Sequence, residues 1–161
     1  MDTVKVNDNT DETTDGREDS KHSIQVYIDS SKSERGVGAG VVIFKDDKII
    51  DTKKYKLDGH CSNNQAEQLA ILKALENIQN MDTNDKTVQL YTDSRIALES
   101  LKNWKSHKHL TEKIRRKIIE LERQNWKIEF NWVKAHPWHQ GNELVGELAK
   151  EAATNSDIKE R

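Results

Sequence analysis

The sequence has little cysteine, little proline and no long apolar run. Its 161 residues include one cysteine, Cys61, and one proline, Pro137. A single cysteine cannot form an internal disulfide or a thiolate metal site, which excludes disulfide scaffolds and zinc fingers and fits a reducing intracellular setting. No window approaches the roughly 18 apolar residues of a membrane span, and the N-terminus lacks the apolar core of a secretory signal. We therefore expect a protein of the cytoplasm or nucleus that has no membrane segment.

Charged residues are abundant but unevenly distributed. They make up 34% of the chain, with a formal net charge of −2. Residues 1–20 are acidic, and Val4 and Val6 are their only aliphatic side chains, too few to offset the entropy lost on ordering. The remaining length is ordinary for one domain. We expect a disordered acidic tail over 1–20, one domain over 21–156 and a C-terminal tail over 157–161.

The hydrophobic pattern predicts three strands followed by alternating helices and strands. Period-two alternation marks strands at 24–29, 36–44, 49–55, 87–93 and 128–132. Helical spacing of apolar residues marks helices at 64–81, 94–102, 110–121 and 144–152. A polar turn at 45–48 indicates an antiparallel hairpin. This order predicts an α/β fold whose mixed sheet is covered by helices on both faces.

Three acidic residues fall where the predicted sheet would have its reactive edge. Asp29 ends the first predicted strand and Asp93 the fourth, so parallel neighbouring strands would bring the two carboxylates side by side. Glu67, in the first turn of the predicted helix 64–81, could reach the same point. Converging carboxylates repel unless cations hold them, and oxygen ligands suit magnesium or manganese. Taken singly, Asp93 could instead be a helix N-cap.

Four ordered motifs surround these residues. They are Ile28–Ser30, Asn63–Glu67, Tyr91–Arg95, and a run from His136 through Gly141–Glu143 to Leu148–Lys150. Together they resemble the ribonuclease H family over about residues 23–153. The runs Asn63–Ile71 and Trp132–His136 are most similar to the ribonuclease H domains of retrotransposon polyproteins of the non-LTR type.

This resemblance implies a fold, a reaction and a set of catalytic residues. The fold is a ribonuclease H-like five-stranded mixed sheet, with three antiparallel strands followed by parallel ones. The reaction is hydrolysis of the RNA strand of an RNA/DNA hybrid with two Mg²⁺ or Mn²⁺ ions. By analogy Asp29 bridges both ions, while Glu67 and Asp93 hold the ion on the leaving-group side. His136 would assist proton transfer or product release.

The resemblance also implies contacts with nucleic acid. The residues expected to make them are Ser30, Asn63, Asn64, Gln65, Ser94, Arg95, Trp104 and Lys105. Asn64 and Gln65 would face the minor groove, where 2′-hydroxyls distinguish RNA from DNA. The stretch from Leu101 to Lys127 is strongly basic and suits a phosphate backbone, although a solvated helix face is the alternative.

The fourth motif departs from the family's pattern. The family has a carboxylate where this chain has Gly146, and a loop glycine where it has Trp138. Glu143, three residues before Gly146 on the same helical face, is the candidate substitute ligand, through a water. A glycine inside a helix also costs about 1 kcal/mol relative to alanine. We expect the three-carboxylate site to remain, with hydrolysis slowed because the water-activating ion is weakly held.

Three functions are compatible with this pattern. The first is a metal-dependent endoribonuclease, acting as a monomer or beside a reverse transcriptase domain of the same polyprotein. The second is an impaired module that binds hybrid or double-stranded RNA without cutting it, which Gly146 and Trp138 favour. The third is a structural connection domain, which we rank last because three site acids remain.

Overall fold

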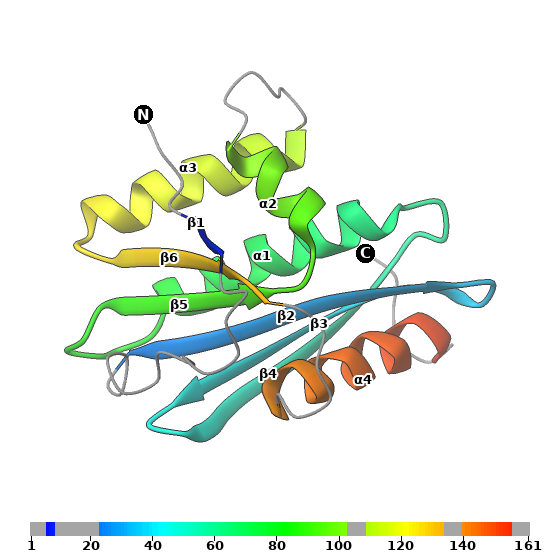
Figure 1. Cartoon of the computed structure of the whole chain (residues 1–161), viewed down its shortest axis with the longest axis horizontal. Coiled ribbons are helices and arrows are strands. Elements are labelled where there is room, and N and C mark those ends of the chain that lie inside the picture. Colours follow the sequence, from blue (N-terminus) through cyan, green and yellow to red (C-terminus); the bar gives the residue numbers. More distant parts are fainter. Residues whose placement is uncertain (1–5, 9–22, 103–108, 134–139, 156–161) are drawn as a thin grey trace.

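A mixed β-sheet with helices on both faces forms the body of the protein (Figure 1). The computed structural model describes residues 6–8, 23–102, 109–133 and 140–155. Its strands are β1 (Val6–Asp8), β2 (Ile24–Ser33), β3 (Gly36–Lys45), β4 (Lys48–Leu57), β5 (Thr87–Thr92) and β6 (Lys127–Trp132). Its helices are α1 (Asn63–Gln79), α2 (Arg95–Lys102), α3 (His109–Arg123) and α4 (Gln140–Thr154).

The strand order across the sheet is β1-β6-β5-β2-β3-β4. Strands β2, β3 and β4 pair antiparallel, and β5 and β6 run parallel to β2. Asp46 and Asp47 connect β3 to β4 with φ angles of 53° and 62°, the left-handed backbone that a tight two-residue hairpin turn requires. The expected five strands, their directions and the order of the helices are all confirmed.

Strand β1 adds a sixth, three-residue strand that the sequence pattern did not predict. It pairs parallel with β6, with Val6 opposite Phe130 and Asp8 opposite Trp132. These three residues belong to the segment expected to be a disordered tail, and they are paired rather than disordered. The other residues of that segment, and residues 157–161, lie outside the described part of the chain.

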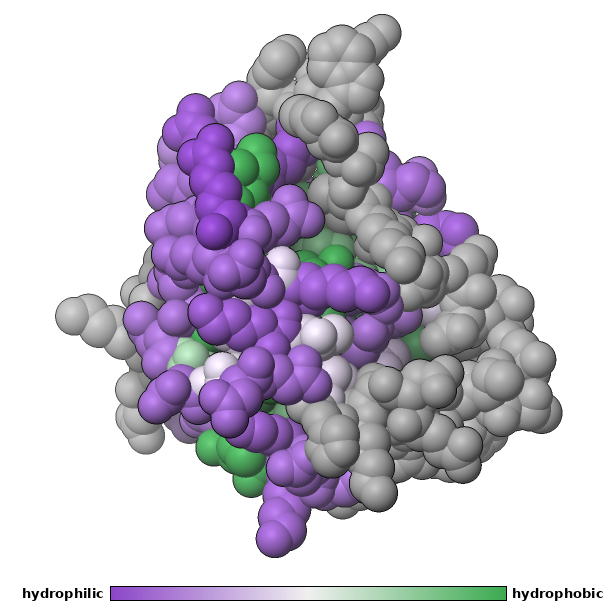
Figure 2. All heavy atoms as spheres, turned by 90° about the vertical axis from the view of Figure 1, so that its left-hand side faces the viewer, coloured by the Kyte–Doolittle hydropathy of each residue, from purple (hydrophilic) through white to green (hydrophobic). Residues whose placement is uncertain are grey.

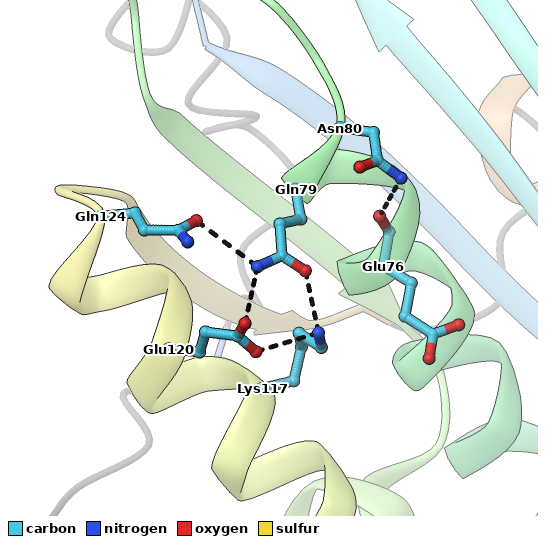
Figure 3. Close-up of polar contacts among 6 residues, drawn as sticks. All are labelled: Glu76, Gln79, Asn80, Lys117, Glu120 and Gln124. Atoms are coloured by element: carbon cyan, nitrogen blue, oxygen red, sulfur yellow. Dashed lines mark hydrogen bonds and ion pairs between the residues drawn. The ribbon is translucent and has the colours of Figure 1, made fainter.

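One face of the sheet packs against α1, α2 and α3. Ile24, Val26 and Ile28 of β2 alternate toward this side and are fully buried in the larger hydrophobic core. Helices α1 and α3 are also joined by polar side chains (Figure 3). The amide of Gln79 on α1 accepts a hydrogen bond of 2.8 Å from Lys117 and donates one of 3.0 Å to Glu120. These contacts fix α1, which carries one of the site acids.

The other face packs against α4, and glycines of β3 allow a close approach. A Cβ atom on Gly38 would lie 2.3 Å from the carbonyl oxygen of Ala149, and one on Gly40 would lie 2.8 Å from that of Val145. No side chain larger than hydrogen fits between the two backbones at these positions. The sheet therefore holds α4 close enough for its residues to reach the site.

The surface away from the site is mostly polar. Figure 2 shows the side on which β5 and β6 begin, where hydrophilic residues cover most of the described surface and hydrophobic atoms form small separate patches. No helix among the described residues combines the length and the apolar character that crossing a membrane requires.

Candidate active site

Asp29 and Asp93 lie where the parallel pairing of β2 with β5 ends. The last paired residues of these strands are Tyr27 and Tyr91, and Asp29 and Asp93 each follow two positions later in the chain. The sequence predicted that Asp29 would end its strand, which is wrong, because β2 continues to Ser33. The extension is stabilised by antiparallel pairing with β3, whereas β5 stops at Thr92 and leaves Asp93 at its end.

Glu67 reaches the same point from α1. Ser62 caps this helix, and its hydroxyl accepts a hydrogen bond from the Gln65 N–H at 3.1 Å. Because α1 begins at Asn63, Glu67 lies at the start of the second turn, not in the first turn as expected. Its side chain is 2% exposed and accepts a hydrogen bond of 2.6 Å from the Thr92 hydroxyl.

The three carboxylates form one cluster. Each of Asp29, Glu67 and Asp93 offers an oxygen, and these oxygens lie within 4.8 Å of one another. The group is half-buried at Asp29 and Asp93 and buried at Glu67. Oxygen-only donors at this separation are the ligands that Mg²⁺ and Mn²⁺ prefer, so the donor set fits a divalent cation.

The electrostatics of the cluster also favour a cation. Burial raises the pKa of Asp29 to about 6; repulsion from Asp93 adds to the rise, while the Ser30 N–H and the Lys150 charge oppose it. Burial raises the pKa of Glu67 to about 7, opposed chiefly by the Thr92 hydroxyl. Burial also raises the pKa of Asp93. A bound divalent ion would offset this penalty and favour the ionised carboxylates.

Helix α4 borders the cluster with a glycine. A Cβ atom on Gly146 would lie 3.2 Å from Oδ2 of Asp29. A carboxylate at this position would therefore project beside Asp29. Lys150, one turn further along α4, lies close enough to Asp29 to influence its pKa. Glu143 is exposed and is not part of the three-carboxylate cluster.

Four of the expected nucleic-acid contacts gather where α1 begins. The Ser30 hydroxyl donates a hydrogen bond of 3.2 Å to the carbonyl oxygen of Asn63, which ties β2 to α1. Gln65 uses its side-chain oxygen in the capping box, where it accepts a 2.8 Å hydrogen bond from the Ser62 N–H. The side-chain oxygen of Asn64 is buried without a hydrogen-bond partner among the described residues.

Two further expected contacts lie at the start of α2. Ser94, not Asp93, caps this helix, because its hydroxyl accepts a hydrogen bond of 3.2 Å from the Ala97 N–H. The Arg95 guanidinium stacks on the ring of Trp132, 4.2 Å from the ring centre. The indole N–H of Trp132 donates a 3.3 Å hydrogen bond to the carbonyl oxygen of Asp93. This contact joins β6 to the acid.

Several expected site residues lie outside the described part of the chain. They are His136, Trp104 and Lys105, and Trp138, which departs from the family's pattern, also lies outside it. Within the basic stretch, Arg115 donates to the carbonyl oxygens of Ser100 and Leu101 at the end of α2, and Lys117 joins α3 to α1. These two cations therefore have structural contacts within the domain.

The roles of Thr92 and of the Trp132 hydrogen bond were not predicted from the sequence. Thr92 directly precedes a predicted site acid, and its side chain is fully buried. A small polar residue among the apolar residues of a buried strand was the available signal, since buried hydroxyls need partners.

The whole domain matches a known family. The RNase H family profile matches residues 21–154. The chain is 32% identical over 127 residues to "Ribonuclease H" of Rhodopseudomonas palustris (strain HaA2), covering 71% of this chain and 76% of that protein. It is 26% identical over 152 residues to "Ribonuclease H" of Haemophilus influenzae (strain 86-028NP), covering 85% of this chain and 94% of that protein. The chain belongs to the RNase H family.

Solved structures share the fold at low sequence identity. The N-terminal RNase H domain of Rv2228c from Mycobacterium tuberculosis superposes with a TM-score of 0.64 at 19% identity, covering 80% of this chain and 97% of that one. LC11-RNase H1, isolated from compost, has a TM-score of 0.64 at 23% identity, covering 81% of this chain and 95% of that one. The relatives named here do not support the expected kinship with retrotransposon polyproteins.

Proposed function

We propose that the protein is an endoribonuclease that hydrolyses the RNA strand of RNA/DNA hybrids with divalent metal ions. The observation that carries this proposal is the cluster of Asp29, Glu67 and Asp93, whose oxygens lie within 4.8 Å of one another. Membership of the RNase H family and relatives named ribonuclease H support the same reaction.

The three acids would hold the ions at the ends of β2 and β5. Bound Mg²⁺ or Mn²⁺ would supply an activated water and charge stabilisation for the leaving 3′ oxygen. Asp29 is suited to the central position because it belongs to the cluster with the other two acids and also has Oδ2 next to α4. Glu67 and Asp93 are suited to the leaving-group side. His136 stays a prediction for proton transfer or product release.

The start of α1 would recognise the RNA strand. The buried side-chain oxygen of Asn64 is an acceptor that has no donor among the described residues. After rotation of the Asn64 amide to the surface, a ribose 2′-hydroxyl could donate to this oxygen, whereas deoxyribose has no hydroxyl there. Ser30, Asn63 and Gln65 lie beside it, and Arg95 on the other flank of the cluster could contact a phosphate.

Because Gly146 supplies no carboxylate, we expect slower hydrolysis than in an enzyme with four carboxylates. The α4 backbone lies against Asp29, so a side chain at position 146 would point at the site. Glycine supplies no ligand there, and the nearest turn supplies the cation Lys150 instead. An ion on this side of Asp29 would have fewer anionic ligands, and Glu143 could contribute through a bridging water.

The second candidate is a module that binds hybrid or double-stranded RNA without cutting it, and Gly146 is the observation that favours it. A partnership with a reverse transcriptase domain is not part of either proposal, because the relatives named above carry no such name.

The deciding experiment is cleavage of a labelled RNA/DNA hybrid in Mg²⁺ and separately in Mn²⁺, with a gel shift of the same hybrid. Asp29→Asn is the control variant. Cleavage that disappears with Asp29→Asn would establish the enzyme, and a strong preference for Mn²⁺ would indicate a weak ion site. Binding without cleavage in either metal would support the second candidate.

A further inference from the structure

We propose that the hydroxyl of Thr92 is a positioning group that holds the Glu67 carboxylate in the orientation needed to bind a divalent ion. Thr92 is the last residue of β5 and its side chain is fully buried. Its Oγ1 donates a hydrogen bond of 2.6 Å to Oε1 of Glu67. This inference rests on the proposed function only in assuming that Glu67 is a metal ligand.

The hydrogen bonds around Thr92 determine the direction of its hydroxyl. The Ser94 N–H donates to Oγ1 at 3.0 Å and so occupies one lone pair of the hydroxyl oxygen. The hydroxyl hydrogen is thereby free to point toward Glu67, whose ionised, metal-binding form can only accept. The hydroxyl therefore acts as donor to one site acid and as acceptor for the turn that carries another, Asp93.

The backbone of Thr92 is held by its pairing with β6. Thr92 pairs with Trp132 in the β5–β6 register, and its carbonyl oxygen accepts a 3.0 Å hydrogen bond from the Val133 N–H. A β-branched side chain on a fixed strand has few accessible rotamers. The hydroxyl position is thus set by the sheet and not by the ion.

Glu67 needs such a partner because it comes from a different element. Its carboxylate is at the end of a long side chain on α1, whereas Asp29 and Asp93 have short side chains on or next to strands. Fixing one carboxylate oxygen leaves the other oxygen available to an ion. Hydrogen bonds to ligating carboxylates typically affect metal affinity about 10–100-fold.

The test compares Thr92→Val with Thr92→Ser. Valine keeps the shape and removes the hydroxyl, whereas serine keeps the hydroxyl and removes a methyl group. Binding of Mn²⁺ and Mg²⁺ is measured by titration calorimetry, and the thermal unfolding midpoint is measured without metal. We expect Thr92→Val to lose about 10-fold or more in metal affinity and Thr92→Ser to retain most of it.

Thr111→Val is the matched control. Thr111 is equally buried. Its hydroxyl donates a 2.9 Å hydrogen bond to the buried side chain of Gln68, the residue after Glu67. Thr111→Val removes a buried hydroxyl from the contact between α1 and α3. It should lower the thermal unfolding midpoint with little change in metal affinity. The proposal is wrong if Thr92→Val binds metal as well as Thr111→Val does, or if Thr92→Ser fails as Thr92→Val does.

The wild-type titration separates this proposal from the proposed function. If the wild-type protein binds neither ion, the metal site itself fails and the endoribonuclease with it. If the wild-type protein binds an ion and Asp29→Asn does not, the site stands, and the Thr92 variants alone decide the positioning role.

Discussion

The α4 backbone at Gly146 lies against the carboxylate of Asp29, so that an added Cβ atom would be 3.2 Å from Oδ2. Among the described residues, α4 is the one helix on its face of the sheet. Through this contact it reaches the acid cluster. Glycine supplies no side-chain ligand at this position, whereas a carboxylate at position 146 would project beside Asp29.

Gly146→Asp should increase cleavage in Mg²⁺ by about 10-fold or more, because it adds an anionic ligand next to Asp29. The Asp29 carboxylate is the end of a flexible side chain and can move by the few tenths of an ångström that the new Cβ requires. Hybrid cleavage and Mg²⁺ titration check this. Gly146→Ala is the control, since it adds the same Cβ without a carboxylate; equal gains by both variants would show that helix stability, not ligation, was limiting.

The metal-free protein should lose stability as the pH rises from 5 to 8. The folded-state pKa values of Asp29 and Glu67 are raised to about 6 and about 7, so the folded state binds more protons than the unfolded state in this window. The stability that these acids contribute is present at low pH and is lost as the pH rises through their folded-state pKa values, by about 4 kcal/mol in total. Denaturant unfolding in EDTA at several pH values checks this.

Asp29→Asn isolates the contribution of this site to the pH dependence. The variant removes one titrating acid and its repulsion of Asp93, so it should be more stable than the wild type at pH 8 by about 1–2 kcal/mol although it lacks activity. A variant with the wild-type pH dependence of stability would contradict the electrostatic account of the cluster.

Lys150→Gln should make metal binding more sensitive to acid. The Lys150 charge lowers the pKa of Asp29, so its removal raises that pKa, and the pH at which the metal affinity falls to half of its own high-pH value should move upward. Calorimetry across the pH range at low salt measures the midpoint. Lys54→Gln is the control. Lys54, on β4, pairs at 2.8 Å with Glu151, the neighbour of Lys150 on α4, and it is not among the groups that shift the pKa of Asp29. Equal shifts in both variants would exclude a specific effect of Lys150.

Gly38→Ala should destabilise the protein by about 2–3 kcal/mol or more, because its Cβ would meet the α4 backbone at Ala149 and Ala153 within 2.4 Å. Displacement of α4 should also change the environment of Asp29. Gly59→Ala is the control, since nothing lies within 4 Å of its Cβ position. Thermal unfolding of both variants checks the prediction, and a neutral Gly38→Ala would mean that α4 is not held by this contact.

Much of the fold could be predicted because local patterns and packing agree. Ile24, Val26 and Ile28 alternate in the sequence and face one core in the structure. The period of α1 and the polar turn at Asp46–Asp47 also correspond directly to backbone geometry. The strand β1 could not be predicted, because a three-residue strand that pairs only with β6 at the edge of the sheet leaves almost no pattern in the local sequence.

The site was determined at two levels. The amino-acid pattern alone shows which acids are present and that each lies at or near the end of a regular element, because strand and helix periods end at recognisable positions. The folded arrangement is needed to know that β2 continues past Asp29, that the Thr92 hydroxyl meets Glu67 from α1, and that Gly146 faces Asp29. These relationships depend on strand pairing and on how closely helices pack on the sheet, which are contacts between residues far apart in the chain.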